Sequence, residues 1–195
     1  MEKRKKDVDH LTHLVSKAKE LNPDAFSQLY ERYVSPIFRY IYIQIGHYED
    51  AEDLTQSVFL KVWNALPRFK HQGIEMTPWL YTIARNTVID YWRKKKAIII
   101  DNDGEENFFE KIAGEDDVMR AGERKEMKKI IQRYLEMLSH DQREVIVFKF
   151  IEDMSNKDIA RITGKSEAAV RQLQCRALKS LREKMAGVDA LLEHL

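Results

Sequence analysis

The chain has 195 residues, of which 44% are hydrophobic and 33% charged, and its 33 Lys and Arg balance 32 Asp and Glu. Its single cysteine, Cys175, excludes an intrachain disulfide and a cysteine-rich metal site. Since no apolar run approaches the ~20 residues of a transmembrane helix, and the start is hydrophilic, unlike a signal peptide, we expect a cytoplasmic chain with no membrane insertion.

The first half of the sequence has the spacing of long helices. Asn22 followed by Pro23 is a strong helix start, because Asn caps the first turn and Pro fits the first helical position. Pro36 should kink this helix or split it in two, and Gly46 should end it. The predicted elements are helices over 22–45, 49–66 and 77–96, with a loop over 67–76.

An acidic segment over 97–119 separates the two halves of the chain. Between positions 101 and 117, eight acids stand against Lys111 alone. The helical pattern is weakest here, so we expect a linker or a partly ordered segment. From the sequence alone, the acidity has two interpretations: a solvated tether, or a chain that mimics RNA in a basic channel.

Two further helices are predicted after the linker, over 121–138 and 140–151. Ser139 and Gln142 form a capping box at the start of the second helix. No strand-like alternation is found in the sequence, so the expected fold class is all-α, with two small helical domains joined by a flexible acidic linker. The boundaries that follow are 1–96 and 120–186 for the domains, 97–119 for the linker and 187–195 for a C-terminal tail.

Residues 155–182 predict a helix-turn-helix. Ser155 caps a short helix, Gly164 supplies a turn with positive φ, and Ser166 caps a longer helix. The longer helix is expected to bury Val170, Leu173, Ala177, Leu178 and Leu181 and to expose Arg171, Gln172, Arg176 and Lys179. Eight Lys and Arg against three acids between positions 155 and 184 suit a DNA backbone. The alternative is an ordinary antiparallel helix pair with a solvated face.

A resemblance to a known family rests on three strings, AEDLTQSVFLKVWNALPRF, TPWLYTIARNTVIDYWRKK and LSHDQREVIVFKFIEDMSNKDIARITGKSEAAVRQL. In this order they resemble the bacterial RNA polymerase sigma factors of the sigma-70 family, in particular the small extracytoplasmic-function (ECF) type. That type keeps only region 2, which handles the promoter −10 element, and region 4, which handles the −35 element. The resemblance covers about 22–96 and 126–186.

The resemblance makes the 49–66 helix similar to the one that docks on the clamp helices of the polymerase β′ subunit. Asp53 and Gln56 match the motif of that helix, whereas Ser57 replaces an acid. Phe59 and Trp63 are expected to form an exposed pair typical of a docking hot spot; the alternative is that both rings widen the core stripe. The implied core-polymerase-binding residues are Asp53, Gln56, Ser57, Phe59, Leu60 and Trp63.

The 67–76 loop and the helix after it resemble the elements that open a promoter and read its −10 element. Unstacked bases need aromatic surfaces and phosphates need cations, and this stretch supplies both. The implied residues are Arg68, Phe69, Lys70, His71, Gln72, Trp79, Arg85, Asn86, Asp90, Arg93 and Lys94. Tyr81 is a further aromatic candidate. Trp79 has a core position as its alternative, and for His71 a polar loop position is favoured over a metal ligand.

The implied −35 contacts lie on the longer helix of the helix-turn-helix and just before it. They are Lys165, Ser166, Glu167, Arg171, Gln172, Cys175, Arg176 and Lys179. Arg171 or Arg176 can read a guanine bidentately and Gln172 an adenine. For Cys175, a small residue near a helix interface is favoured over a redox sensor. Ala168 and Ala169 replace the Gly-Thr pair that is usual in the family, so one hydroxyl for a phosphate is missing.

The resemblance implies an alternative sigma factor that binds core RNA polymerase through its β′ and β subunits, recognises promoter −10 and −35 elements and helps to melt the DNA. An anti-sigma factor is an expected partner; no cofactor, metal or catalytic activity is expected. Three alternatives remain: a free-standing helix-turn-helix regulator, a sigma mimic that sequesters an anti-sigma factor, and an enzyme. The sequence offers no phosphate-binding Gly loop, catalytic pair or metal spacing for the last.

Overall fold

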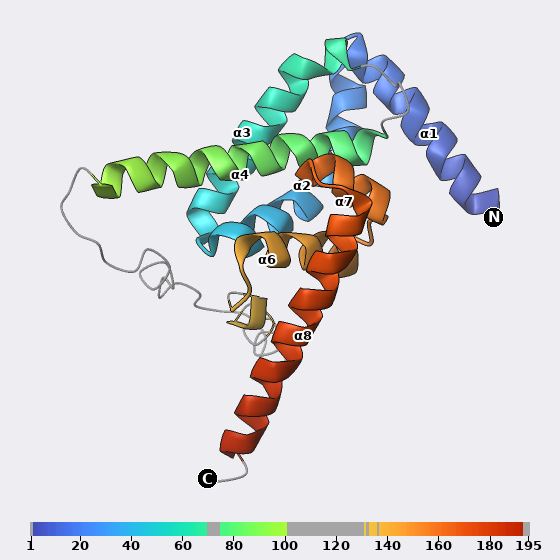
Figure 1. Ribbon diagram of the computed structural model, residues 1–195. Helices are drawn as coiled ribbons and strands as arrows, with labels where there is room; N and C mark the ends of the chain where they lie inside the picture. The colour runs from blue at the N-terminus through green and yellow to red at the C-terminus, as the bar shows by residue number, and fades with distance from the viewer. Residues whose placement is uncertain (1, 70–74, 101–130, 132, 136, 193–195) are drawn as a thin grey trace. The chain divides into compact units, whose positions relative to one another are not determined.

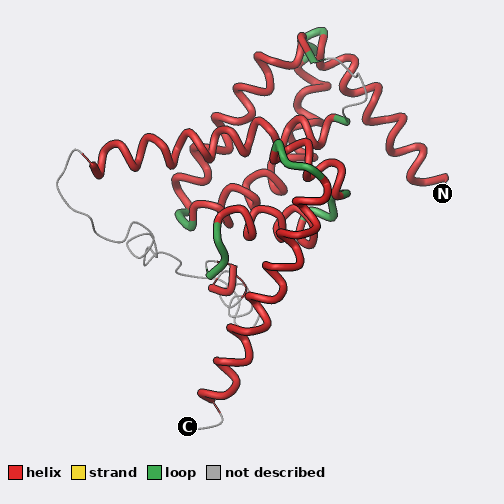
Figure 2. Tube along the Cα trace, in the orientation of Figure 1, coloured by secondary structure: helices red, strands yellow, loops and turns green. Residues whose placement is uncertain are grey.

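The structure is a computed structural model that describes residues 2–69, 75–100, 131, 133–135 and 137–192 (Figure 1). Within these residues the chain forms helices, loops and turns and no strands, as Figure 2 shows, so the predicted all-α fold is confirmed. The chain divides into two compact units, Met1–Gly114 and Glu115–Leu195. The acidic run at 101–117 and most of the helix predicted over 121–138 lie outside the described residues.

The first unit contains four α-helices and one short 3-10 helix in its described part. They are α1 (Glu2–Lys19), α2 (Pro23–Ile45), α3 (Tyr48–Ala65), the 3-10 helix η1 (Leu66–Arg68) and α4 (Met76–Ile100). The Asn22 side chain accepts a 2.9 Å hydrogen bond from the Ala25 N–H, and Gly46 ends α2 with φ 75°, as predicted. One helix runs through Pro36, so Pro36 does not split it. Helix α4 continues to Ile100, four residues into the segment predicted as a linker.

The core of the first unit lies where α2, α3 and α4 meet. Its fully or almost fully buried residues include Leu29, Ile37 and Ile41 of α2, Ala51, Val58 and Val62 of α3, and Leu80, Ala84 and Val88 of α4. Side-chain hydrogen bonds tie α4 to its neighbours: Tyr33 to Thr77 at 2.9 Å, Lys61 to Thr87 at 2.9 Å, and Tyr91 to Asp50 at 2.6 Å. These contacts fix the position of α4 relative to α2 and α3.

Helix α1 adds a layer to this core that the sequence did not reveal. It packs against α2 and η1 and buries Leu14, Val15 and Ala18. These three residues lie at i, i+1 and i+4, which gives a narrow apolar stripe on an otherwise charged helix. Helix α1 therefore braces η1, the segment from which the 67–76 loop departs.

The second unit contains α6 (His140–Ile146), the π-helix η3 (Val147–Ile151), α7 (Asn156–Thr163) and α8 (Glu167–Leu192). The predicted capping box is present, with the Ser139 N–H donating to Gln142 Oε1 at 3.2 Å. The helix predicted over 140–151 is thus an α-helix that widens into a π-turn near its end.

Helices α7 and α8 form the predicted helix-turn-helix. The Ser155 hydroxyl accepts from the Asp158 N–H at 3.1 Å, and Gly164 ends α7 with φ 69°. Ser166 accepts from the Ala169 N–H at 3.1 Å at the start of α8.

The buried stripe of α8 is narrower than predicted. Val170 and Ala177 are buried, but Leu178 is 46% exposed, so its assignment to the buried stripe was wrong. At 100° per residue, Leu178 lies about 80° around the helix from Val170, whereas Ala177 lies within about 20° of it. The contacts of α8 with α6 and α7 therefore cover Ala177 and leave Leu178 outside.

Candidate functional site

Helix α3 presents an exposed face that contains several of the predicted polymerase-binding residues. Asp53 and Gln56 are exposed, and Leu60 is 65% exposed, which is unusual for so apolar a side chain. We call these three residues the α3 surface. Ser57 is half-buried beside it. The spacing i, i+3 and i+7 places the three side chains along one side of the helix, opposite the buried Ala51 and Val58.

The predicted exposed pair of Phe59 and Trp63 is not found. Phe59 is only 6% exposed, and its ring packs edge-on against Tyr30 of α2 with centroids 4.7 Å apart. Trp63 is half-buried and packs edge-on against Phe26, also at 4.7 Å. The two aromatic residues of α2 are four positions apart, as are the two of α3, so the rings pair across the helix interface. The interpretation that the rings widen the core stripe is correct for Phe59.

A shallow apolar hollow of about 340 Å³ lies between α2 and the end of α3. Pro23, Phe26, Ser27, Tyr30 and Trp63 line it. We call it the α2–α3 hollow. The sequence analysis did not predict this hollow. The spacing of Phe26 and Tyr30, four residues apart and therefore on one face of the helix, could have indicated an aromatic surface there.

The start of the 67–76 loop is anchored rather than free. Phe69 is 4% exposed, and its ring lies 4.7 Å from that of Trp79, centroid to centroid. The prediction that Phe69 offers an open ring to unstacked bases is therefore wrong, because α4 supplies a partner for it. Trp79 itself is half-buried, and Arg68 is exposed. The predicted contacts Lys70, His71 and Gln72 lie outside the described residues.

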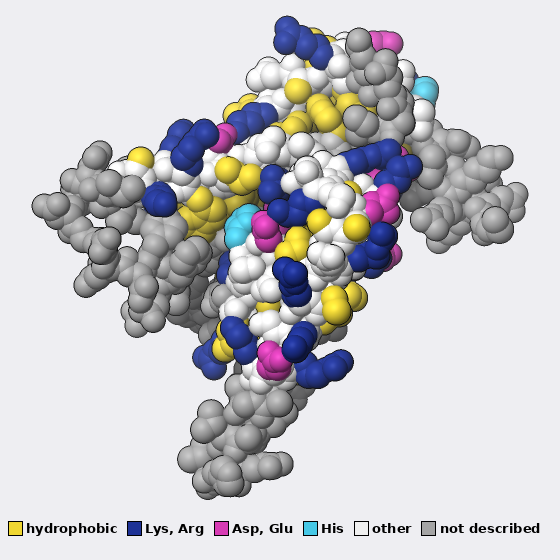
Figure 3. Space-filling view, viewed as in Figure 1, with side chains coloured by type: hydrophobic (Ala, Val, Ile, Leu, Met, Phe, Trp, Pro, Cys, Tyr) yellow, Lys and Arg dark blue, Asp and Glu magenta, His cyan; other side chains and the backbone are white. Residues whose placement is uncertain are grey.

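Helix α4 carries the remaining −10 candidates. Asn86 and Lys94 are exposed, and Arg85 is half-buried. Arg93 donates a 2.7 Å hydrogen bond to Asp90, three residues earlier. In Figure 3, Lys and Arg side chains gather over the C-terminal half of this helix.

Tyr81, the further aromatic candidate on α4, was wrongly expected at the surface. It is 2% exposed, and its ring packs edge-on against Tyr40 of α2 at 5.6 Å. Tyr81 therefore belongs to the core of the first unit.

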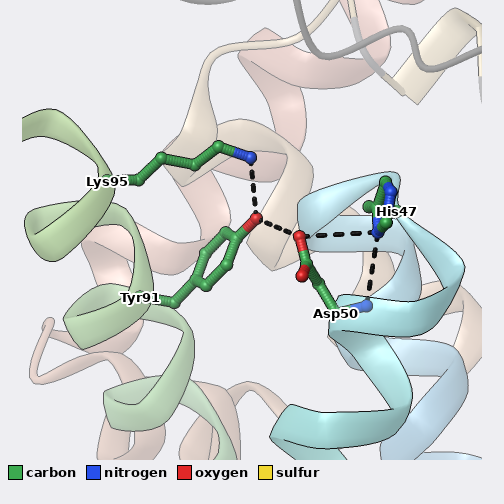
Figure 4. Close-up of polar contacts among 4 residues, drawn as sticks. All are labelled: His47, Asp50, Tyr91 and Lys95. Atoms are coloured by element: carbon green, nitrogen blue, oxygen red, sulfur yellow. Dashed lines mark hydrogen bonds and ion pairs between the residues drawn. The ribbon is translucent and has the colours of Figure 1, made fainter. Parts of the chain in front are cut away.

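A chain of polar contacts that sequence analysis missed joins the start of α3 to the end of α4 (Figure 4). The Tyr91 hydroxyl donates to Asp50 Oδ2 at 2.6 Å and accepts from Lys95 Nζ at 2.9 Å. His47 caps α3, its Nδ1 accepting from the Asp50 N–H at 3.3 Å. Burial, followed by the hydrogen bond to Asp50 and the charge of Asp50, raises the pKa of Tyr91 far above its usual value. The hydroxyl therefore stays protonated in alkaline solution where an ordinary tyrosine would ionise.

The outer face of α8 carries the predicted −35 residues in an accessible position. Ser166, Glu167, Arg171, Gln172, Cys175, Arg176 and Lys179 are all exposed. The exposure of Cys175 contradicts its placement near a helix interface. Arg171 lies 3.8 Å from Glu167, and Lys179 lies 3.8 Å from Glu183. Such exposed pairs are worth little, so both cations can exchange to a DNA partner.

Lys165 lies just before α8 and differs from the other cations of this face. It is half-buried, and its ammonium donates to Asp141 of α6 at 2.9 Å. His140, Asp141 and Glu144 bring potential metal ligands within 4.8 Å of one another in the described residues. The Lys165 ammonium already neutralises Asp141, so this cluster is poorly suited to a cation.

None of the described helices is long and apolar enough to cross a membrane.

Comparison with known families decides which protein class these two units form. Residues 29–98 match Sigma-70 region 2, and residues 128–181 match Sigma-70, region 4. The chain belongs to the sigma-70 family. The first match begins inside α2 and extends to the last residues of α4, and the second extends into α8, so the resemblance found in the sequence is confirmed.

Individual relatives place this sigma-70 family member among the ECF sigma factors. It is 33% identical to the ECF RNA polymerase sigma factor BldN of Streptomyces coelicolor over an alignment of 178 residues. This alignment covers 90% of this chain and 66% of BldN. It is 26% identical over 156 residues to the ECF sigma factor SigM of Bacillus subtilis, with 80% and 91% covered. A similar solved structure is that of the sigma factor RpoE in complex with the anti-sigma factor NepR from Bartonella quintana. It matches this chain with a TM-score of 0.71 and 25% sequence identity, and the match covers 83% of this chain and 96% of RpoE.

Proposed function

We propose that this ECF family member is an alternative sigma factor that binds core RNA polymerase and directs it to particular promoters. Sigma factors are transcription regulators, and the chain would act in the cytoplasm with the polymerase and carry out no catalytic step itself. The first unit would bind the polymerase and the −10 element, and the second would bind the −35 element.

The observation that carries this proposal is the α3 surface, formed by Asp53, Gln56 and Leu60. A free-standing helix-turn-helix regulator has no need for an exposed leucine flanked by polar groups on a second domain. The leucine supplies apolar area, and the two polar side chains supply hydrogen bonds and orientation. The surface lies where the family resemblance expects the β′ clamp helices to dock.

The α2–α3 hollow extends the surface that a polymerase subunit could contact. Its lining includes Trp63, which lies three residues after Leu60 on α3. Aromatic pockets of this kind are where interface hot spots concentrate. We therefore retain Trp63 as a proposed binding residue. Phe59 would contribute indirectly, because its buried ring packs against Tyr30 and holds that side of the hollow in place.

Promoter opening is proposed for the loop and the exposed face of α4. Phe69 and Trp79 form a packed base for the loop, so the contacts with unpaired DNA would come from Arg68, Lys70, His71 and Gln72 and from the open part of the Trp79 ring. Arg85, Asn86, Asp90, Arg93 and Lys94 would follow along α4. Cations and planar side chains are what a displaced strand requires.

Recognition of the −35 element is proposed for the exposed face of α8. Arg171, Gln172 and Arg176 can reach base edges in a major groove, whereas Lys179 is better suited to a phosphate. Ser166, Glu167 and Cys175 lie on the same face and complete the proposed contact set. The ion pair with Asp141 makes Lys165 a weaker candidate than the sequence indicated.

An anti-sigma factor is proposed as a further partner. The similar RpoE structure contains NepR, which is an anti-sigma factor. A protein that covers the α3 surface would prevent polymerase binding, so a simple competition suffices for regulation.

The proposal is tested by selecting DNA from a randomised duplex library with the chain alone and with the chain bound to core polymerase from the source bacterium. An alternative sigma factor should enrich two short motifs separated by a fixed spacing when polymerase is present. Enrichment of one palindromic motif by the chain alone would instead support a helix-turn-helix regulator, because dimeric regulators bind two-fold symmetric sites.

A further inference from the structure

Lys95 of α4 is held more firmly than a surface lysine usually is. Its ammonium donates to the Tyr91 hydroxyl at 2.9 Å and lies over the Tyr91 and Trp92 rings, 5.2 and 5.8 Å from their centroids. Cation–π contacts and a hydrogen bond together restrict a side chain that otherwise has four free torsions. In the described part of the chain, Tyr91 is the one hydrogen-bond acceptor of this ammonium, which leaves two of its three donors available.

The direction of the Tyr91 hydrogen bond is fixed by Asp50. The hydroxyl proton points to the carboxylate of Asp50 at 2.6 Å, so the oxygen can only accept from Lys95. Asp50 is itself held in the first turn of α3, where His47 accepts from its backbone N–H and lies 3.5 Å from its carboxylate. A chain of contacts through His47, Asp50 and Tyr91 therefore ends at the Lys95 ammonium and determines where it lies (Figure 4).

The neighbouring cations of α4 are placed differently. Arg93 is hydrogen-bonded to Asp90 within the same helix and is mostly exposed. Lys94 is exposed, and the Tyr91 hydroxyl donates to Asp50 and accepts from Lys95 instead. Among Arg93, Lys94 and Lys95, only Lys95 is therefore held in place, within the described residues, by a contact that involves side chains of both α3 and α4.

We propose that Asp50 and Tyr91 are positioning residues that hold Lys95 for a phosphate of the promoter DNA. This inference rests on the proposed function, because it assumes that α4 faces the −10 region. An ammonium is a compact charge with several donors, which suits a phosphate better than a base edge. Holding it in place in advance removes much of the entropy that a free lysine loses on binding.

The test measures binding of the holoenzyme, the chain with core polymerase, to a fluorescent duplex of the promoter selected above, over a series of KCl concentrations. Lys95→Gln should lower the salt slope by about one unit. Tyr91→Phe keeps every charge and most of the packing, yet should weaken binding because Lys95 is no longer held. In the Tyr91→Phe background, Lys95→Gln should then cause a much smaller fold-change in Kd than in the wild type.

Lys94→Gln is the matched control, since its fold-change should be the same in both backgrounds. Asp50→Asn is a second positioning variant that retains the Tyr91 ring and hydroxyl, and it should also reduce the effect of Lys95→Gln. Equal fold-changes for Lys95→Gln in all backgrounds would show that Asp50 and Tyr91 only stabilise the fold, and an unchanged salt slope for Lys95→Gln would exclude a phosphate contact. Failure of the wild-type holoenzyme to bind the duplex would overturn the proposed function, and this inference with it.

Discussion

The ring of Phe69 packs against the ring of Trp79 with centroids 4.7 Å apart, and this contact joins the end of η1 to the first turn of α4. The 67–76 loop therefore departs from a fixed base. Tyr33 and Thr77, hydrogen-bonded at 2.9 Å, fix the other side of the loop. Both residues that border the loop segment outside the described structure, Phe69 before it and Glu75 after it, therefore lie next to fixed contacts.

Phe69→Ala is expected to destabilise the first unit. Removal of a buried phenylalanine ring costs about 3–5 kcal/mol, and we expect a value near the lower limit because Trp79 is only half-buried and can relax. Urea unfolding followed by circular dichroism measures the loss, with Phe69→Leu as the control that keeps most of the buried area. A stability equal to that of the wild type would contradict the burial of Phe69.

Lys70→Ala tests the loop without disturbing its base. The variant should leave binding of the holoenzyme to duplex promoter almost unchanged and reduce open complex, because a loop cation acts on the displaced strand. Permanganate reactivity of unpaired thymines reports the open complex. If thymines react equally in the variant and the wild type, the loop takes no part in melting.

Polymerase binding tests the α3 surface. Asp53→Ala combined with Gln56→Ala should weaken association with core polymerase by roughly 1–3 kcal/mol while the helix content stays the same. Gln28→Ala, which removes an exposed polar side chain of α2, is the matched control and should bind as the wild type does. Association is measured by fluorescence anisotropy of a labelled chain. Retention of full affinity by the folded double variant would remove this helix from the interface.

The burial of Tyr91, together with its hydrogen bond to Asp50, predicts how stability depends on pH. Because the folded state raises the pKa of Tyr91, it holds the proton more tightly than the unfolded state, whose tyrosine pKa is about 10. The stabilisation is complete below this unfolded value and is lost as the pH rises above it. Unfolding free energies measured in a series of alkaline buffers should fall more steeply for the wild type than for Tyr91→Phe. Parallel curves for the two proteins would contradict the shift.

Readout of the −35 element separates two classes of residue on α8. Arg171→Ala or Arg176→Ala should cost about 1–3 kcal/mol on the selected promoter and flatten discrimination at one or two positions. Lys179→Ala should weaken binding to all sequences alike and lower the salt slope by about one unit. A matrix of −35 substitutions measured with each variant distinguishes these outcomes. Arginine variants that keep the wild-type sequence preference would place the specificity elsewhere.

The parts of the fold that depend on local signals could be predicted from the sequence. Asn22, Gly46 and Gly164 mark helix ends through capping and left-handed backbone conformations, which involve only a few neighbouring residues. The helix-turn-helix and its exposed basic face follow from the same kind of signal. The caps and the 3.6-residue period were therefore sufficient for the fold class and for the order of the described helices from α2 onward, but not for α1.

The errors concern side chains whose environment depends on a second helix. Phe59, Phe69 and Tyr81 were expected at the surface, and each is buried by an aromatic residue of another helix. The period of one helix shows which direction a side chain points but not whether a partner ring lies there. The bond between Asp50 and Tyr91 joins residues 41 positions apart, so no local pattern could reveal it.

Run-off transcription on the selected promoter tests the central claim most directly. Core polymerase is combined with buffer, with the wild-type chain, with the Asp53→Ala and Gln56→Ala double variant, or with Arg171→Ala. We predict a transcript of one defined length with the wild type, none with core polymerase alone, and strongly reduced amounts with either variant. Transcription that is the same with and without the wild-type chain would contradict the assignment as a sigma factor.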